Sequence, residues 1–263
     1  MNHTLHAVSA GEGENVLLLH GLFGQGSNLR SVARALENEF RVHCLDLPDH
    51  GRSLWLRHTS LEAYAQAVIR WMSEQQLARA HIIGHSLGGK VAMQLALNHR
   101  ESLSSLVVAD ISPVRYSGAH EKILAAMASV EAQRCQTRTE AEGILAKVID
   151  DPSVIGYLMM SLTRADGYYE WKLNLRGLSA GYEQLRAVPS GSRAFDGPTL
   201  FVKGSDSQYI QAAHESEISR RFPRSNLIAI EGAGHWVHVD QPQAFCHAVR
   251  EHLIRFSSGE RPA

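Results

Sequence analysis

The sequence has little cysteine, almost no net charge and no long apolar run. Its three cysteines are spaced too widely for a metal site or a disulfide framework, which suits a reducing compartment. A formal net charge of −1 favours neither nucleic acid nor an anionic membrane surface as a partner. No run of about 18 apolar residues occurs, so we expect no membrane span. Residues 1–14 lack the apolar centre of a secretion signal, and we therefore expect a cytoplasmic protein.

What the sequence does contain is an alternation of short apolar runs with amphipathic stretches. Apolar runs that predict strands cover residues 5–9, 15–20, 40–46, 80–83, 103–110, 199–203 and 226–230. Helices are expected over residues 29–37, 61–76, 88–97, 212–222 and 242–256. Ser27 or Asn28 is expected to cap the first of these helices. The alternation predicts an α/β fold, with a mostly parallel central sheet flanked by helices and ligands bound at the carboxyl ends of its strands.

The alternation stops in residues 115–190. Apolar residues there follow helical spacing, and no buried strand is expected. We therefore predict an α/β core formed by residues 1–114 and 191–263, with an inserted helical cap formed by residues 115–190. The methionine and aromatic side chains of the cap could line an apolar pocket, although packing between the cap helices explains any one of them better.

The stretch HIIGHSLGG (81–89) carries the strongest chemical signal in the chain. Ser86 stands between Gly84 and Gly88 in the pattern G-x-S-x-G, after a predicted strand and before a predicted helix. A serine on so sharp a turn has its hydroxyl lifted above the sheet, and its close neighbours must be nearly free of side chains. The pattern therefore predicts a nucleophile elbow with Ser86 as the nucleophile.

A base is needed to activate this serine, because a hydroxyl is a poor nucleophile until its proton is removed, usually by histidine. His235 is the candidate, since it follows the last predicted strand in a glycine-rich loop at the same edge of the sheet. The order serine, acid, histidine along the chain supports it over a plain surface-loop histidine. His235 and His238 could also be read as a metal pair, but no carboxylate or thiolate cluster supports a metal site.

Two backbone N–H groups are expected to stabilise the oxyanion that forms during attack. Leu87 follows the serine at the start of a helix, where its N–H is free. Leu22 lies in the turn after the second predicted strand and is the natural second donor. Because both donors belong to the main chain, no side-chain substitution removes them cleanly.

Two aspartates could orient His235. Asp110 ends the strand that follows the elbow, and Asp206 lies in the loop Gly204–Ser207, just past the strand 199–203. Both positions lie at the correct edge of the sheet, so topology alone does not choose between them. Asp110 is favoured because apolar residues surround it in the sequence, whereas Asp206 stands among residues that are common in turns.

Five stretches of the chain together resemble the α/β-hydrolase superfamily and, more closely, YbfF-type esterases, small bacterial ester and acyl-CoA hydrolases with a mitochondrial relative. They are HGLFG (20–24), HGRS (50–53), GHSLGGK (84–90), DISPV (110–114) and GAGHWVH (232–238). The match extends over almost the whole chain. The resemblance implies ester hydrolysis without a cofactor, and it implies the aspartate of DISPV, Asp110, as the acid. The chain departs from the pattern where such relatives tend to read G-N-S, because its GSDS adds Asp206 as a second possible acid.

We therefore expect a serine hydrolase that forms an acyl-enzyme on Ser86, with His235 as the base and Asp110 as the acid. Its expected partner is a small-molecule ester, with acyl thioesters left open, and no cofactor, metal or nucleic acid is expected. The oligomeric state is left open. A carbon–carbon bond hydrolase and a cofactor-free perhydrolase are alternatives on the same triad. A ligand-binding protein without turnover is the alternative from another class, and an assay with p-nitrophenyl butyrate separates it from the enzymes.

Overall fold

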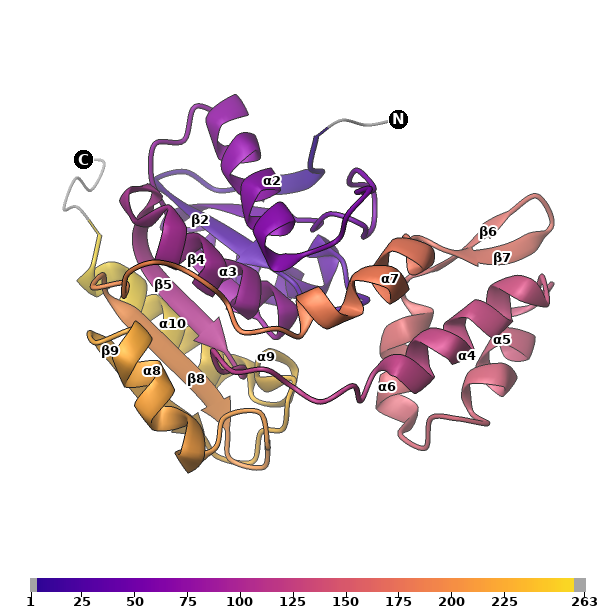
Figure 1. Ribbon diagram of the computed structural model, residues 1–263. Helices are drawn as coiled ribbons and strands as arrows, with labels where there is room; N and C mark the ends of the chain where they lie inside the picture. Colours follow the sequence, from indigo (N-terminus) through magenta and orange to yellow (C-terminus); the bar gives the residue numbers. More distant parts are fainter. Residues whose placement is uncertain (1–3, 258–263) are drawn as a thin grey trace.

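A computed structural model describes residues 4–257 and contains a seven-stranded central sheet with helices on both faces (Figure 1). Its strands are β1 (Ala7–Ala10), β2 (Glu14–Leu19), β3 (Phe40–Leu45), β4 (Ala80–His85), β5 (Leu103–Ala109), β8 (Thr199–Gly204) and β9 (Ser225–Ile230). They are ordered β1-β3-β2-β4-β5-β8-β9, and only the pairing of β1 with β3 is antiparallel. The expected α/β fold with a mostly parallel sheet is confirmed.

Two apolar layers pack against this sheet, which explains why its central strands are continuous apolar runs. Along β2, Leu17 and Leu19 belong to the cluster on one face, and Val16 and Leu18 belong to the cluster on the other. The first cluster includes residues of α2 (Leu61–Glu74), α3 (Leu87–Asn98) and α8 (Glu215–Arg221), and the second includes residues of α1 (Arg30–Leu36) and α10 (Pro242–Arg255). None of the helices within residues 4–257 has both the length and the apolar character needed to cross a bilayer.

The entry into the first helix differs from the prediction. The chain forms a short 3-10 turn, Gly26–Leu29, before α1 begins, and the N-cap residue of that turn is Gln25. The expectation that Ser27 or Asn28 caps the helix is wrong, because both residues lie inside this turn. The side chain of Asn28 instead accepts a hydrogen bond from the N–H of Gln25 at 2.7 Å.

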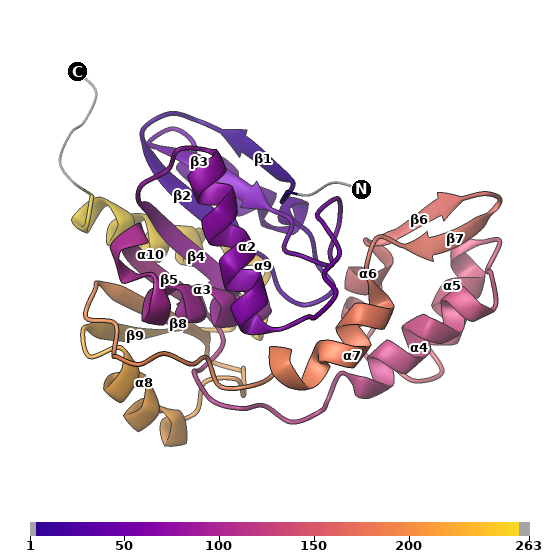
Figure 2. The same cartoon turned by 45° about the horizontal axis from the view of Figure 1, so that its top comes forward.

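Between β5 and β8 the chain makes a separate group of elements, which Figures 1 and 2 show to one side of the sheet. They are α4 (Glu121–Ala132), α5 (Arg138–Leu145), α6 (Pro152–Met159), β6 (Leu162–Ala165), β7 (Tyr168–Trp171) and α7 (Leu175–Leu185). We call residues 115–190 the insertion. Most of its elements are helices, and β6 and β7 form an antiparallel hairpin that the sequence pattern did not predict. Residues 1–3 and 258–263 of the predicted core lie outside the described residues.

Both connections between the insertion and the sheet meet at one side chain, that of Lys90 on α3. Lys90 is only 2% exposed, and its ammonium donates hydrogen bonds to the carbonyl oxygens of Val114, Arg186 and Ala187. Burial lowers the pKa of Lys90 to about 7, while the three carbonyl acceptors offset the loss of water around the charge. The outgoing and returning chains are thereby tied to the helix that follows Ser86.

Candidate active site

Ser86 occupies the sharp turn between β4 and α3. Its φ of 53° and ψ of −116° lie in a region that residues other than glycine rarely adopt. A Cβ atom on Gly84 would lie 2.2 Å from the carbonyl oxygen of Gly88, and one on Gly88 would lie 2.1 Å from the carbonyl oxygen of Leu19. Glycine is therefore required at position 84 by the backbone of the turn itself, and at position 88 by the backbone at the end of β2.

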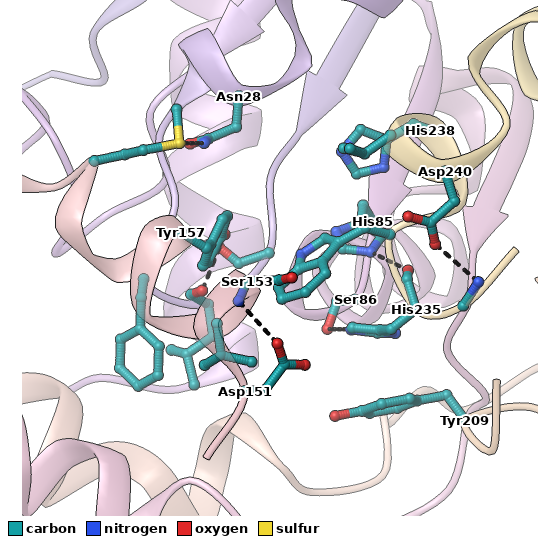
Figure 3. Close-up of a pocket in the computed structure, with 18 of the residues that line it drawn as sticks. Asn28, His85, Ser86, Asp151, Ser153, Tyr157, Tyr209, His235, His238 and Asp240 are labelled. Carbon is teal, nitrogen blue, oxygen red and sulfur yellow. Dashed lines mark hydrogen bonds between the residues drawn. The ribbon is translucent and has the colours of Figure 1, made fainter. Parts of the chain in front are cut away.

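A continuous chain of hydrogen bonds joins Ser86, His235 and Asp110, although these residues are far apart in the sequence. His235 Nε2 lies 3.0 Å from Ser86 Oγ (Figure 3). On the other side of the ring, His235 Nδ1 lies 2.7 Å from Asp110 Oδ2. Each residue follows a parallel strand directly or by a short loop, at the carboxyl edge of the sheet. The structure thus brings together the three residues that the sequence predicts as nucleophile, base and acid.

Asp110 is completely buried and is held by three hydrogen bonds. Besides the contact with His235, its carboxylate accepts hydrogen bonds from the N–H of Gly204, at 3.2 Å, and from the hydroxyl of Ser207. The sequence pattern did not indicate a role for Ser207, although its position just past β8 places it at the same edge of the sheet. These donors fix the carboxylate oxygen that faces the histidine.

Asp206, the alternative acid, is placed differently. Its side chain is exposed, and its carboxylate accepts a hydrogen bond from Ser205 Oγ at 3.0 Å. Its own N–H donates to the carbonyl oxygen of Ala233, which joins the loop after β8 to the loop after β9. In this structure Asp206 is a loop residue, and the carboxylate at His235 is that of Asp110.

The imidazole of His235 is held in position by contacts on its ring and on its main chain. Tyr209 stacks on the ring with centroids 3.9 Å apart and planes at 19°. His85 donates from Nε2 to the carbonyl oxygen of His235 at 2.8 Å. Burial lowers the pKa of His85 well below its ordinary value and lowers that of His238 to about 4. Neither His85 nor His238 therefore adds a positive charge near His235.

The two expected oxyanion donors lie in the turn after β2 and at the start of α3. Leu87 is the first residue of α3, where the N–H has no partner within the helix. Leu22 lies in the turn 20–24, which is closed by a hydrogen bond of 3.1 Å from the N–H of Gly24 to the carbonyl oxygen of Gly21. Within residues 4–257, neither the N–H of Leu22 nor that of Leu87 donates a hydrogen bond to another protein group.

Two buried histidines support the turn 20–24 from the core side. His20 donates from Nδ1 to the carbonyl oxygen of Gly21 at 2.8 Å, and its Nε2 accepts from the N–H of Leu47 at 2.9 Å. His50 Nε2 accepts from the N–H of Phe23 at 3.2 Å. Burial lowers the pKa of both rings, to about 3 for His50. Both are therefore neutral at pH 7, which leaves each Nε2 able to accept.

Ser86 opens into a pocket of about 790 Å³ between the core and the insertion (Figure 3). We call its two sides the core wall and the insertion wall. The core wall consists of residues from loops at the carboxyl edge of the sheet, among them Leu22, Phe23, Ser86, His235 and Trp236. The insertion wall consists of residues on α4 and α6 and beside them, among them His120, Ile123, Val154, Tyr157 and Met160. A second cavity, of about 50 Å³, adjoins Ser86 near Leu87 and Tyr116.

The charged residues that line the larger pocket are acidic. They are Asp151, which caps α6, and Asp240 at the end of α9 (Val237–Asp240), and none of the described lining residues is lysine or arginine. Among residues 4–257, no three His, Cys, Asp or Glu side chains are placed to share a metal ion. The hydrogen-bonded residues Ser86, His235 and Asp110 can support nucleophilic chemistry at Ser86. The acidic lining favours ligands that carry no negative charge near Asp151 and Asp240.

Comparisons with known proteins show what this chain is similar to. A family model described as "Alpha/beta hydrolase family" matches residues 16–248. The chain is 37% identical over 246 residues to sn-1-specific diacylglycerol lipase ABHD11 of Mus musculus, covering 90% of this chain and 80% of that protein. It is 34% identical over 242 residues to Esterase YbfF of Escherichia coli strain K12, covering 90% of this chain and 92% of that protein.

A solved structure described as "Marine microorganism esterase" matches with a TM-score of 0.92 and 34% sequence identity. The match covers 96% of this chain and 100% of the chain in that structure. This likeness includes the insertion, because it extends over nearly the whole chain. Together with the sequence relatives it confirms the resemblance to YbfF-type esterases.

Proposed function

Because the chain belongs to the alpha/beta hydrolase family, we propose that it hydrolyses carboxylic esters through an acyl-enzyme formed on Ser86. The observation that carries the proposal is the unbroken hydrogen-bond chain from Asp110 through His235 to Ser86. Such a chain lets the imidazole accept the serine proton, because the carboxylate holds the imidazole in the correct tautomer. Relatives named as an esterase and as a diacylglycerol lipase support an ester as the substrate.

The proposed reaction proceeds in two halves. Ser86 Oγ attacks the acyl carbon while His235 Nε2 takes its proton, and the resulting oxyanion is stabilised by the N–H groups of Leu22 and Leu87. His235 then returns the proton to the leaving alcohol. A water molecule, activated by His235 in the same way, hydrolyses the acyl-enzyme and restores Ser86. These steps require no cofactor.

We propose an uncharged ester as the substrate in preference to an acyl-CoA thioester. Two cavities meet at Ser86, which suits a substrate with a group on each side of the bond that is cleaved. The carboxylates of Asp151 and Asp240 in the larger pocket oppose the entry of an anionic leaving group, because a cleft lined by one sign of charge repels that sign.

We also propose that residues 115–190 act as a cap domain on a core formed by residues 1–114 and 191–263. The insertion supplies a whole wall of the pocket, and the contacts of Lys90 hold its two connections together. A cap of this kind excludes water from the acyl-enzyme except where the pocket opens and limits which ester groups can reach Ser86.

The test of this function compares Ser86→Ala with Ser27→Ala, a change at another serine that lines the same pocket. We expect turnover of p-nitrophenyl butyrate to fall by several orders of magnitude in the first variant only, because the triad acts as a unit. A fluorophosphonate should modify one peptide of the wild type, the one that contains Ser86. Labelling of a different serine, together with full activity of Ser86→Ala, would overturn the mechanism. Faster turnover of butyryl-CoA than of the neutral ester would overturn the proposed substrate class.

A further inference from the structure

The turn that carries Leu22 is held from the insertion as well as from the core. Tyr157 on α6 donates its hydroxyl hydrogen to the carbonyl oxygen of Leu22 at 3.1 Å, and its Oη lies 3.5 Å from the carbonyl oxygen of Gly21. Ser161, just after α6, donates to the carbonyl oxygen of Phe23 at 2.7 Å. Three consecutive carbonyls of the turn therefore lie within reach of two insertion hydroxyls (Figure 3 shows Tyr157).

These contacts help to hold the direction of the Leu22 N–H, chiefly through the peptide plane next to its own. A peptide group is planar, so the position of each carbonyl oxygen fixes the N–H that shares its plane. The plane that contains the Leu22 N–H is held through the carbonyl of Gly21 by His20 and by the N–H of Gly24. The next plane is held by His50 on its N–H and by Tyr157 on its carbonyl. Without Tyr157 the second plane keeps only its core contact.

Gly24 provides an independent sign that the turn is shaped for Tyr157. A Cβ atom on Gly24 would lie 2.3 Å from Tyr157 Oη, closer than any other atom, with the carbonyl oxygen of Gly21 next at 3.1 Å. Gly24 does not have a positive φ, so its backbone conformation is open to other residues. The last glycine of HGLFG is therefore required chiefly by the tyrosine hydroxyl that reaches over it.

We propose that Tyr157 and Ser161 are positioning residues for the oxyanion site, through which the insertion takes part in the chemical step as well as in substrate selection. This inference rests on the proposed function, because it assigns the Leu22 N–H to the oxyanion. Removing an oxyanion donor altogether lowers kcat by about 10² to 10³. Loosening the turn that carries one donor should cost a part of that factor, about tenfold for each hydroxyl.

The first experiment compares Tyr157→Phe and Ser161→Ala with Tyr169→Phe, a change in the same insertion at a tyrosine that lies on β7, away from the pocket. We expect kcat on p-nitrophenyl butyrate to fall about tenfold in the first two variants, with KM within about twofold and an unchanged Tm. Binding of a trifluoromethyl ketone, whose adduct with Ser86 carries an oxyanion, should weaken by the same factor as kcat. The Tyr169→Phe variant should match the wild type in all of these.

The second experiment is a double-mutant cycle between Tyr157 and Gly24. Gly24→Ala alone should lower kcat as Tyr157→Phe does, because the added methyl group displaces the hydroxyl. In the Tyr157→Phe background, Gly24→Ala should lower kcat by a further factor of less than about three, since the hydroxyl is already absent. Additive losses would overturn the inference, as would a rise in KM with kcat and ketone affinity unchanged. Failure of the proposed function would appear instead in the wild type, as absent turnover and absent labelling of Ser86.

Discussion

The core wall and the insertion wall face each other across one pocket but are built in different ways. The core wall presents Ser86 and His235, with Asp110 buried behind His235. The positions of all three follow from the register of parallel strands that end at one edge. The insertion wall presents mostly apolar side chains from helices, such as Ile123 and Val154. The difference teaches that the proposed reacting groups come from the sheet. The insertion acts on them through shape and through contacts with the main chain.

The largest expected effect sharpens this comparison within the core wall. Replacing the acid of a serine triad with its amide lowers kcat by about 10⁴, because the histidine is left in the wrong tautomer. Asp110→Asn should show a loss of this size on p-nitrophenyl butyrate while its circular dichroism spectrum stays that of the wild type. Asp206→Asn is the matched control and should remain within about tenfold of the wild type, since its carboxylate faces Ser205. The reverse result would show that Asp206 is the acid, and similar losses in both would show a shared role.

The second prediction concerns low pH, which should destabilise the core behind the pocket through its buried neutral histidines. Burial lowers the pKa of His50 to about 3 and that of His238 to about 4. An unfolded histidine titrates near about 6.5, so below that pH the unfolded chain binds protons that the folded chain does not. The stability that these groups contribute is therefore complete above about pH 6.5 and is lost as the pH falls toward 4, by about 1.4 kcal/mol per pH unit for each histidine.

Urea denaturation at several pH values between 7 and 4 measures this slope. For His50→Gln, the free energy of unfolding should fall less steeply with decreasing pH than for the wild type, by about 1.4 kcal/mol per pH unit. The same change at the exposed His58 should leave this slope unaltered. If all three proteins lose stability with the same slope, His50 does not contribute to the pH dependence.

The smallest expected effect belongs to the insertion wall. Val154→Ala removes methyl groups from the pocket lining, and each methylene-sized contact contributes roughly 0.8 kcal/mol, or about fourfold in kcat/KM. In a series of p-nitrophenyl esters from acetyl to dodecanoyl, the loss should appear only for chains long enough to reach position 154. Val148→Ala, at a half-exposed insertion residue outside the pocket, is the control. An equal loss at every chain length would mean that Val154 supports the fold and does not contact the substrate.

Much of the core could be predicted because its signals are local. Each buried strand is a short apolar run. The elbow at Ser86 brings the end of a strand, the two glycines of G-x-S-x-G and the start of a helix together within nine residues. The choice between Asp110 and Asp206 was not local, since both follow strands at the same edge. It depends on burial and on donors such as Ser207, which lies 97 positions along the chain from Asp110.

The insertion was harder to predict, for two physical reasons. The hairpin of β6 and β7 is only partly buried, so its strands lack a continuous apolar run. Its turn did leave a signal, because Asp166 and Gly167 both have positive φ, as a tight two-residue hairpin turn requires, and Asp-Gly is a preferred pair there. The hydroxyls of Tyr157 and Ser161 gave no such signal, since nothing nearby in the sequence indicates the carbonyls that they reach.

Lys90 also bears on how such a protein can be engineered. Its ammonium meets one carbonyl on the chain leaving the sheet and two on the chain returning to it, from a helix that begins directly after Ser86. A foreign cap grafted in place of residues 114–187 would therefore have to present carbonyl oxygens at these same points, or leave the buried amine of Lys90 without partners. In a chimera the junction is the part to conserve, and the helices beyond it are the part that can be exchanged.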